Sequence, residues 1–183
     1  MWSNQGDDLN NIRAIIMDVD GVLTDGMVIL GTGKAELKSF HIRDGMAITI
    51  ARRCGMKIGF ITSRTSDVVQ RRGEELQIDY LLQGVRDKLS KLMEISLSES
   101  IPLEGICYIG DDIIDIPILR RVGFSATVHD APDEVKSCVS YVPKNKGGRE
   151  AVRDIIRHIL TRQGRWKETI DSMIKDWEKE AVE

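Results

Sequence analysis

The chain has 183 residues, of which 42% are hydrophobic, 30% charged and 5% aromatic. This composition supplies enough apolar material for the core of one soluble domain and excludes a disordered protein. Lys and Arg (26) nearly balance Asp and Glu (29), and the net charge of -3 excludes the positive excess that a nucleic-acid or anionic-membrane partner would need.

Targeting and redox signals are absent from the sequence. No apolar run approaches the roughly 18 residues of a membrane span, and residues 1–11 are polar, without the apolar segment of a secretion signal. We therefore expect a cytoplasmic protein. The three cysteines, Cys54, Cys107 and Cys138, form no CxxC pair and lie in apolar stretches, so we expect neither a disulfide nor a thiolate metal site.

Short apolar runs alternate with amphipathic stretches along the chain. The run at 12–17 is rich in β-branched residues and ends abruptly at Asp18, which is typical of a buried strand. Similar runs follow at 57–61, 80–82, 105–109 and 124–128, the second of them weaker. Apolar residues at helical spacing occupy 47–54 and 89–97. This alternation predicts an α/β fold with a three-layer, Rossmann-like parallel sheet covered by helices on both faces.

Two segments depart from the alternation. Residues 27–30 and 35–40 are strand-like and flank a Gly-rich turn at 31–34, which predicts a β-hairpin inserted after the first strand. No linker interrupts residues 1–162, which we predict to form one domain. Residues 163–183 carry an apolar stripe that predicts an amphipathic helix docked on this domain or on a subunit partner, made of Trp166, Ile170, Met173, Trp177 and Ala181.

Polar residues follow the predicted strands at the edge where an open parallel sheet binds ligands. Asp18 and Asp20 come after the first strand and repel each other unless a cation or a proton intervenes. With Asp111 or Asp112 from another strand end they form a hard oxygen cluster suited to Mg²⁺. A hydroxyl from Thr62 and an ammonium from Lys88 suit phosphoryl oxygens. Any single aspartate could merely cap a helix or make a turn, but the whole set favours a phosphate-handling metal site.

These residues resemble the haloacid dehalogenase superfamily of phosphatases. Asp18-Val19-Asp20-Gly21-Val22-Leu23-Thr24 is similar to its DxDGxxT/V signature, and the other motifs follow in order as Thr62-Ser63, Lys88 and Gly110-Asp111-Asp112-x-x-Asp115. The resemblance implies a HAD-like fold.

The resemblance narrows to small sugar-acid phosphatases typified by 3-deoxy-D-manno-octulosonate 8-phosphate (KDO 8-phosphate) phosphatase. The similar stretches are 18–26, 40–46, 61–64, 83–88, 108–115 and 147–149. Two positions depart from the family pattern, Ser63 in place of Gly and His41 in place of Asn, and both concern substrate contacts rather than the reaction.

The resemblance implies an Mg²⁺-dependent phosphomonoesterase that forms an aspartyl-phosphate. Asp18 is then the nucleophile, and Asp20 the general acid and base. Thr62 and Lys88 stabilise the phosphoryl oxygens. The metal ligands are the side chains of Asp18 and Asp111 and the backbone carbonyl of Asp20. Asp112 and Asp115 are expected one shell out, orienting Lys88 or metal-bound water.

The resemblance also implies a sugar-acid phosphate as substrate. Its carboxylate suits arginine side chains, and the expected substrate-binding residues are Asp20, His41, Ile42, Arg43, Asp44, Gly45, Ser63, Arg64, Arg72 and Lys88. For Arg72 a solvated helix face beside Arg71 is an equal alternative.

No cap domain fits between Asp25 and Ile61 or between Arg64 and Lys88. The site is therefore open, and a neighbouring subunit could cover it. The resemblance implies a homotetramer to which the hairpin contributes. The C-terminal helix could then place Arg165 or Lys167 near a substrate.

Three other readings stay open. A sister phosphatase would act on a nine-carbon sugar acid 9-phosphate, such as that of 2-keto-3-deoxynononate (KDN) or N-acetylneuraminate. A non-enzymatic phospho-acceptor of the receiver type would use similar residues, but receivers place the acidic pair first and the acceptor on a later strand. A regulatory subunit derived from an enzyme would have lost catalytic residues, whereas here Asp18, Asp20, Thr62, Lys88 and Asp111 are all present.

Overall fold

A computed structural model of the chain describes residues 9–33 and 35–180. Lys34 of the predicted hairpin turn, Ala181 of the predicted apolar stripe and residues 1–8 lie outside the described residues. Within the described part of the chain, no helix has both the length and the apolar character needed to cross a membrane.

The strands form one parallel sheet and one small antiparallel hairpin. The sheet has the order β5-β4-β1-β6-β7, with β1 in the middle. Its strands are β1 (Ala14–Met17), β4 (Lys57–Ile61), β5 (Tyr80–Leu82), β6 (Ile106–Ile109) and β7 (Phe124–Ala126). All four residues of β1 are buried, as expected for a strand covered on both faces. The predicted parallel α/β fold with an inserted hairpin is confirmed.

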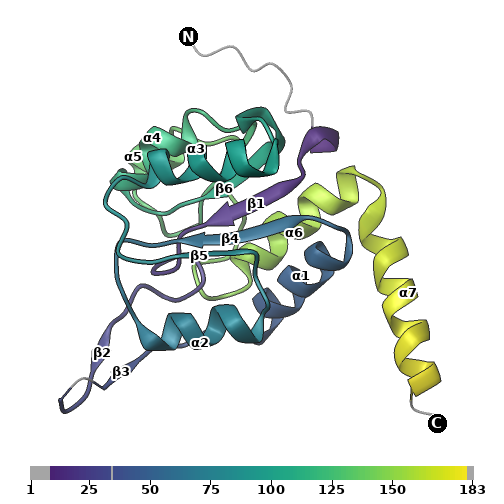
Figure 1. Cartoon of the computed structure of the whole chain (residues 1–183), viewed down its shortest axis with the longest axis horizontal. Helices are drawn as coiled ribbons and strands as arrows, with labels where there is room; N and C mark the ends of the chain where they lie inside the picture. Colours follow the sequence, from purple (N-terminus) through teal and green to yellow (C-terminus); the bar gives the residue numbers. More distant parts are fainter. Residues whose placement is uncertain (1–8, 34, 181–183) are drawn as a thin grey trace.

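Helices cover both faces of this sheet. Figure 1 shows α3 (Lys88–Glu99) and α4 (Ile116–Leu119) above it, and α1 (Ile42–Arg53), α2 (Asp67–Glu75) and α6 (Ala151–Arg162) below it. The remaining short helices are η1 (Leu9–Asn11), η2 (Leu103–Gly105), η3 (Ile113–Asp115) and α5 (Asp133–Lys136). Between the motif-bearing strand ends lie only the hairpin with α1, and α2 with β5, so the described chain contains no cap domain.

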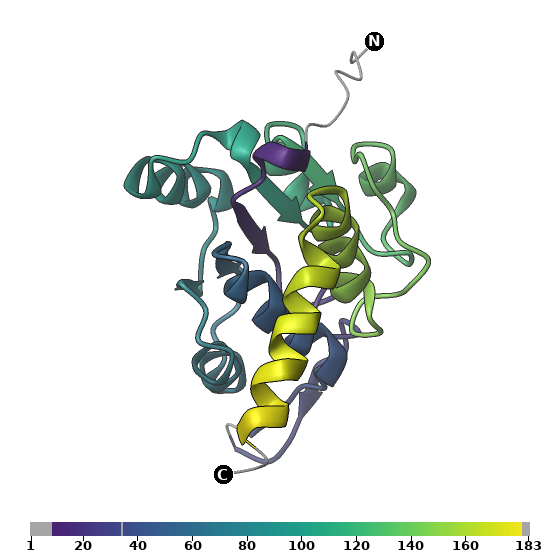
Figure 2. The same cartoon turned by 90° about the vertical axis from the view of Figure 1, so that its right-hand side faces the viewer.

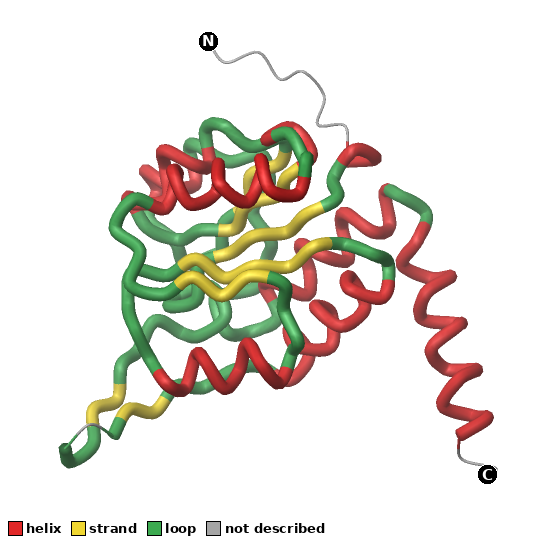
Figure 3. The backbone as a smooth tube through the Cα atoms, in the orientation of Figure 1, coloured by secondary structure: helices red, strands yellow, loops and turns green. Residues whose placement is uncertain are grey.

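The hairpin and the C-terminal helix extend from opposite sides of the domain. Strands β2 (Ile29–Leu30) and β3 (Glu36–Leu37) pair Ile29 with Leu37 and project beyond the carboxyl ends of the parallel strands (Figure 3). Helix α7 (Arg165–Glu180) packs on α6 and α1 (Figure 2), and Met173 is its buried anchor. The expected amphipathic helix is therefore present and docks on its own chain.

Candidate active site

Hydrogen bonds to the Thr24 side chain and a close contact of Gly21 with Asp111 fix the loop after β1. Asp18 continues the ladder, since its amide donates to the Ile109 carbonyl (2.9 Å). The buried Thr24 hydroxyl accepts hydrogen bonds from the Gly21 and Gly26 amides, both at 3.2 Å. Gly21 has a φ of +88°, and a Cβ there would lie 1.9 Å from Asp111 Oδ2. Only glycine therefore lets the two strand-end loops approach this closely.

Asp18 and Asp115 share the ammonium group of Lys88. Lys88 opens α3 and is 3% exposed, and its Nζ donates to Asp18 Oδ2 (2.6 Å) and to Asp115 Oδ1 (2.9 Å). Asp115 is fully buried and also accepts from the Tyr108 hydroxyl (2.8 Å) and from the Asp111 amide (3.2 Å). The network fixes the lysine between two carboxylates, where it can face an anion bound at Asp18.

The carboxylates of this cluster are held in an unusual electrostatic state. Burial raises the pKa of Asp18 to about 6, against the opposing charge of Lys88. Burial, followed by the charges of Asp18 and Asp115, raises the pKa of Asp111 to about 8. Although burial opposes it, the two neighbouring carboxylates raise the pKa of Lys88, which keeps it charged. The cluster therefore has too few positive charges for all its carboxylates to ionise.

These residues fit a divalent cation. Oxygens of Asp18, Asp111 and Asp115 lie within 4.8 Å of one another. Asp111 Oδ1 is buried, and no described residue gives it a hydrogen bond, whereas both oxygens of Asp115 accept hydrogen bonds. Asp111 thus has an oxygen free to bind Mg²⁺, whereas Asp115 supports Lys88. Asp18 as a second ligand stays a prediction, because its two oxygens accept hydrogen bonds from the Val19 amide and from Lys88. The backbone carbonyl of Asp20 as a further ligand stays a prediction.

The loop after β4 brings Thr62 to the same edge. Its amide donates to the Leu82 carbonyl (3.0 Å), which extends the pairing of β4 with β5, and its buried hydroxyl accepts from the Arg64 amide (3.3 Å). Arg64 reaches back to the hairpin, where Nη2 donates to Glu36 Oε1 (3.0 Å). Ser63 between them is exposed.

Several predicted substrate residues make contacts within the chain. The His41 side chain caps α1, and Arg43 pairs with Glu150 at 2.8 Å. Arg72 pairs with Glu75 at 2.8 Å, and its guanidinium lies 5.6 Å from the centre of the Phe40 ring. Ile42 is exposed, whereas Gly45 contacts Arg72 so closely that a Cβ would lie 2.3 Å from Nη2. Their substrate roles stay predictions.

Asp44 and Asp112 act as helix caps. Asp44 is 1% exposed and accepts hydrogen bonds from the amides of Arg153 (2.7 Å) and Glu150 (3.2 Å), so it caps the start of α6 from within α1. Asp112 accepts from the Ile113 amide at the start of η3 (2.7 Å). Asp112 and Asp115 were expected to orient Lys88 or metal-bound water, and of these two it is Asp115 that contacts Lys88.

Sequence reasoning missed Lys38. Its side chain has 0% exposure and forms ion pairs with Asp20 Oδ1 and, at 3.4 Å, with Glu36 Oε1. The sequence did contain a signal for this residue, because Glu36, Lys38 and Phe40 occupy every second position and so share one face of an extended segment after the hairpin turn. The partner across the loop was visible only after folding.

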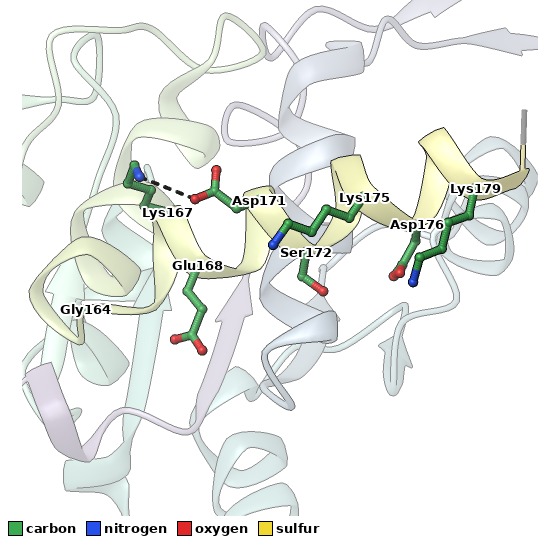
Figure 4. Close-up of a pocket in the computed structure, with 8 residues that line it drawn as sticks. All are labelled: Gly164, Lys167, Glu168, Asp171, Ser172, Lys175, Asp176 and Lys179. Carbon is green, nitrogen blue, oxygen red and sulfur yellow. Dashed lines mark hydrogen bonds and ion pairs between the residues drawn. The ribbon is translucent and has the colours of Figure 1, made fainter.

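One hollow of this chain lies along α7 and is lined by side chains of that helix. It has a volume of about 650 Å³, and Figure 4 shows both acidic and basic side chains around it, with Lys167 paired to Asp171. Arg165 donates to the Cys54 carbonyl at the end of α1. Within one chain, helix α7, which carries Arg165 and Lys167, therefore lies away from the carboxyl ends of the strands (Figure 1).

Comparisons with known proteins show that the chain is similar to haloacid dehalogenase-like hydrolases and to phosphatases. Residues 82–156 match the family model described as haloacid dehalogenase-like hydrolase. The chain is 39% identical over 158 residues to the 3-deoxy-D-manno-octulosonate 8-phosphate phosphatase of Escherichia coli K12, covering 86% of this chain and 84% of the relative. The chain is also 39% identical over 153 residues to the corresponding phosphatase of Yersinia pestis, covering 84% of this chain and 82% of the relative.

Two solved structures of octulosonate 8-phosphate phosphatases are similar in fold. The phosphatase of Moraxella catarrhalis, in complex with magnesium, phosphate and KDO, superimposes with a TM-score of 0.88 at 32% identity over 93% of this chain and 98% of that one. The cobalt-bound phosphatase of Haemophilus influenzae superimposes with a TM-score of 0.82 at 36% identity, over 85% of this chain and 91% of that one.

Proposed function

The chain belongs to the KDO 8-phosphate phosphatase family of haloacid dehalogenase-like hydrolases, and from that premise we propose that it hydrolyses KDO 8-phosphate to KDO and inorganic phosphate. One observation carries the proposal. Asp18, at the end of the central strand, is held by the Val19 amide (2.7 Å) and Lys88 (2.6 Å) next to the unpaired oxygen of Asp111. This supplies a nucleophile, a cation for phosphoryl oxygens and a metal-binding carboxylate in one place.

Each residue of the cluster has a distinct task in the proposed reaction. Asp18 attacks phosphorus in line and takes the phosphoryl group as an aspartyl-phosphate. Lys88 and Thr62 donate hydrogen bonds to the phosphoryl oxygens as charge develops on them. Asp20 gives a proton to the departing sugar oxygen and later takes one from the attacking water. Asp115 keeps Lys88 in place through its 2.9 Å ion pair.

Asp18 and Asp111 would hold Mg²⁺, which reduces the repulsion between the Asp18 carboxylate and a phosphate dianion and stabilises the transferring phosphoryl group. The fit rests on the buried, unpartnered Oδ1 of Asp111 and on the raised pKa of that carboxyl. A proton or a cation must satisfy such an oxygen, and Lys88 forms its ion pairs with Asp18 and Asp115.

The site is open within one chain, and the hairpin offers a surface for a neighbour. Met27, Ile29, Leu30 and Leu37 are all more than half exposed, and apolar side chains gathered on a projecting hairpin favour burial against another protein surface. We assign this surface to self-association in a homotetramer whose neighbouring subunit covers the active site. Leu30→Glu should dissociate the assembly in light scattering coupled to gel filtration, and an unchanged mass would contradict this assignment.

Phosphate release tests the activity. The substrates are KDO 8-phosphate, KDN 9-phosphate, N-acetylneuraminate 9-phosphate, common hexose phosphates and p-nitrophenyl phosphate, each measured with Mg²⁺ and with a chelator. We expect metal-dependent turnover concentrated on KDO 8-phosphate and abolished by Asp18→Asn. Asp25→Asn is the matched control, because Asp25 lies exposed in the same loop.

Each other outcome has a defined meaning. A preference for a nine-carbon substrate would move the chain to the sister activity and make Ser63 and His41 the first positions to examine. Absence of turnover on every ester would favour a phospho-acceptor or regulatory role and overturn the proposal.

A further inference from the structure

Four charged side chains meet where the hairpin joins the loop after β1. Lys38 pairs with Asp20 Oδ1 and, at 3.4 Å, with Glu36 Oε1. Arg64 reaches the same two acids, with Nη2 at 3.0 Å from Glu36 Oε1 and Nε at 3.7 Å from Asp20 Oδ2. This group joins three segments distant in sequence, namely the nucleophile loop, the hairpin and the loop after β4.

The two cations of the group differ in their surroundings. The Lys38 side chain has 0% exposure, whereas that of Arg64 is 49% exposed. An ion pair at the surface is worth little because water screens it and both side chains move. A buried ammonium keeps a fixed position because any departure from its carboxylates leaves a charge unpaired. Lys38 is therefore the cation that restricts Asp20.

The pairing distinguishes the two oxygens of Asp20. An ammonium group only donates hydrogen bonds, so Oδ1 of Asp20 is the acceptor whether or not the carboxyl carries a proton. Oδ2 is buried, and no described residue gives it a hydrogen bond. We infer that Lys38 is a positioning residue that anchors Asp20 through Oδ1 and leaves Oδ2 as the oxygen that exchanges protons with substrate and water, a role that rests on the proposed function.

Each bond and proton change of the reaction then takes place at a defined atom. As the bond between phosphorus and the sugar oxygen breaks, the phosphoryl group joins the Asp18 carboxylate and the proton on Asp20 Oδ2 passes to the departing oxygen. Water then attacks the aspartyl-phosphate and returns a proton to Oδ2. Phosphate leaves, and Asp18 and Asp20 regain their starting states. Lys38 donates to Oδ1 throughout and takes no part in bond making.

Comparing two esters separates this role from a structural one. An alkoxide leaving group such as that of KDO 8-phosphate needs the proton, whereas p-nitrophenolate departs without one. In Lys38→Met we expect kcat/KM for KDO 8-phosphate to fall by at least about tenfold, and kcat/KM for p-nitrophenyl phosphate to stay within about threefold. Lys38→Gln serves as a second variant if Met at this buried position prevents folding. Lys136→Met is the matched control, because Lys136 pairs with Asp133 of α5, whose side chain is fully exposed, and it should leave both values unchanged.

A second comparison tests whether Lys38 acts through Asp20. In an Asp20→Asn background there is no acid proton to position, so adding Lys38→Met should change kcat/KM for KDO 8-phosphate by less than about threefold. Equal losses on both esters, no loss on either, or fully multiplicative effects of the two substitutions would overturn the inference. If the wild-type protein hydrolyses p-nitrophenyl phosphate but not KDO 8-phosphate, the proposed substrate fails instead, and another alkyl phosphate that it turns over replaces KDO 8-phosphate in the comparison.

Discussion

Magnesium binding should release a proton from Asp111. Burial and the neighbouring carboxylates raise the pKa of this group from its usual 3.8 to about 8, so it is protonated in the metal-free protein at neutral pH. A metal ion must displace that proton to bind the carboxylate. With a pKa of about 8, about 0.9 proton should be released per Mg²⁺ at pH 7 and about 0.1 at pH 9. The apparent affinity should rise about tenfold per pH unit below pH 8.

The same shift predicts how the metal-free fold responds to pH. Because the pKa of Asp111 is higher in the folded than in the unfolded chain, its contribution to stability is fully present below about pH 3.8 and is lost as the pH rises towards 8. The slope from this group is at most about 1.4 kcal/mol per pH unit. The thermal midpoint of the metal-free protein should therefore fall between pH 6 and pH 8, and saturating Mg²⁺ should remove most of that fall.

Isothermal titration calorimetry measures the released protons. Mg²⁺ is titrated at pH 7 and pH 9 in buffers with different ionisation enthalpies, and the dependence of the observed heat on buffer gives the proton count. Asp111→Asn should abolish the release and weaken binding, whereas Asp133→Asn, with a fully exposed side chain, should preserve both. Release of less than about 0.3 proton at pH 7, or the same release from Asp111→Asn, would refute the reasoning.

Three further changes test the scaffold around the site. Asp44→Ala should lower the free energy of unfolding by about 2–4 kcal/mol, because it removes the acceptor of two backbone amides at the start of α6; urea denaturation measures it, and a loss below about 1 kcal/mol would contradict a capping role. Gly147→Ala should abolish turnover and lower the thermal midpoint, since a Cβ would lie 1.7 Å from the Gly21 carbonyl oxygen; unchanged values in both assays would show that the loop adapts. Removing residues 164–183 should lower the thermal midpoint because Met173 is buried, yet keep the KM for KDO 8-phosphate, whereas a raised KM would place the tail at a neighbour's site.

Local sequence patterns were sufficient for the sheet and for the acidic edge. A buried strand that ends in Asp18 is apolar throughout because helices cover both of its faces, so the run at 12–17 and its successors mark the sheet without any tertiary information. Parallel strands must present their carboxyl ends at one edge. Because Asp18, Thr62 and Asp111 each follow such a strand, the sequence places them at the same edge.

Contacts between distant loops were decided only by the folded chain. Asp44 lies in a stretch that resembles a substrate loop, yet its carboxylate turns inward to amides more than a hundred residues away. Lys38 follows a hairpin whose paired part is only two residues long on each side. No feature of the neighbouring sequence indicates that Asp20 is its partner. Residue type and spacing determine which chemistry a strand end can offer. Which cation meets which carboxylate depends on how loops fold back over the sheet, because a buried charge takes its partner from whatever the packing places beside it.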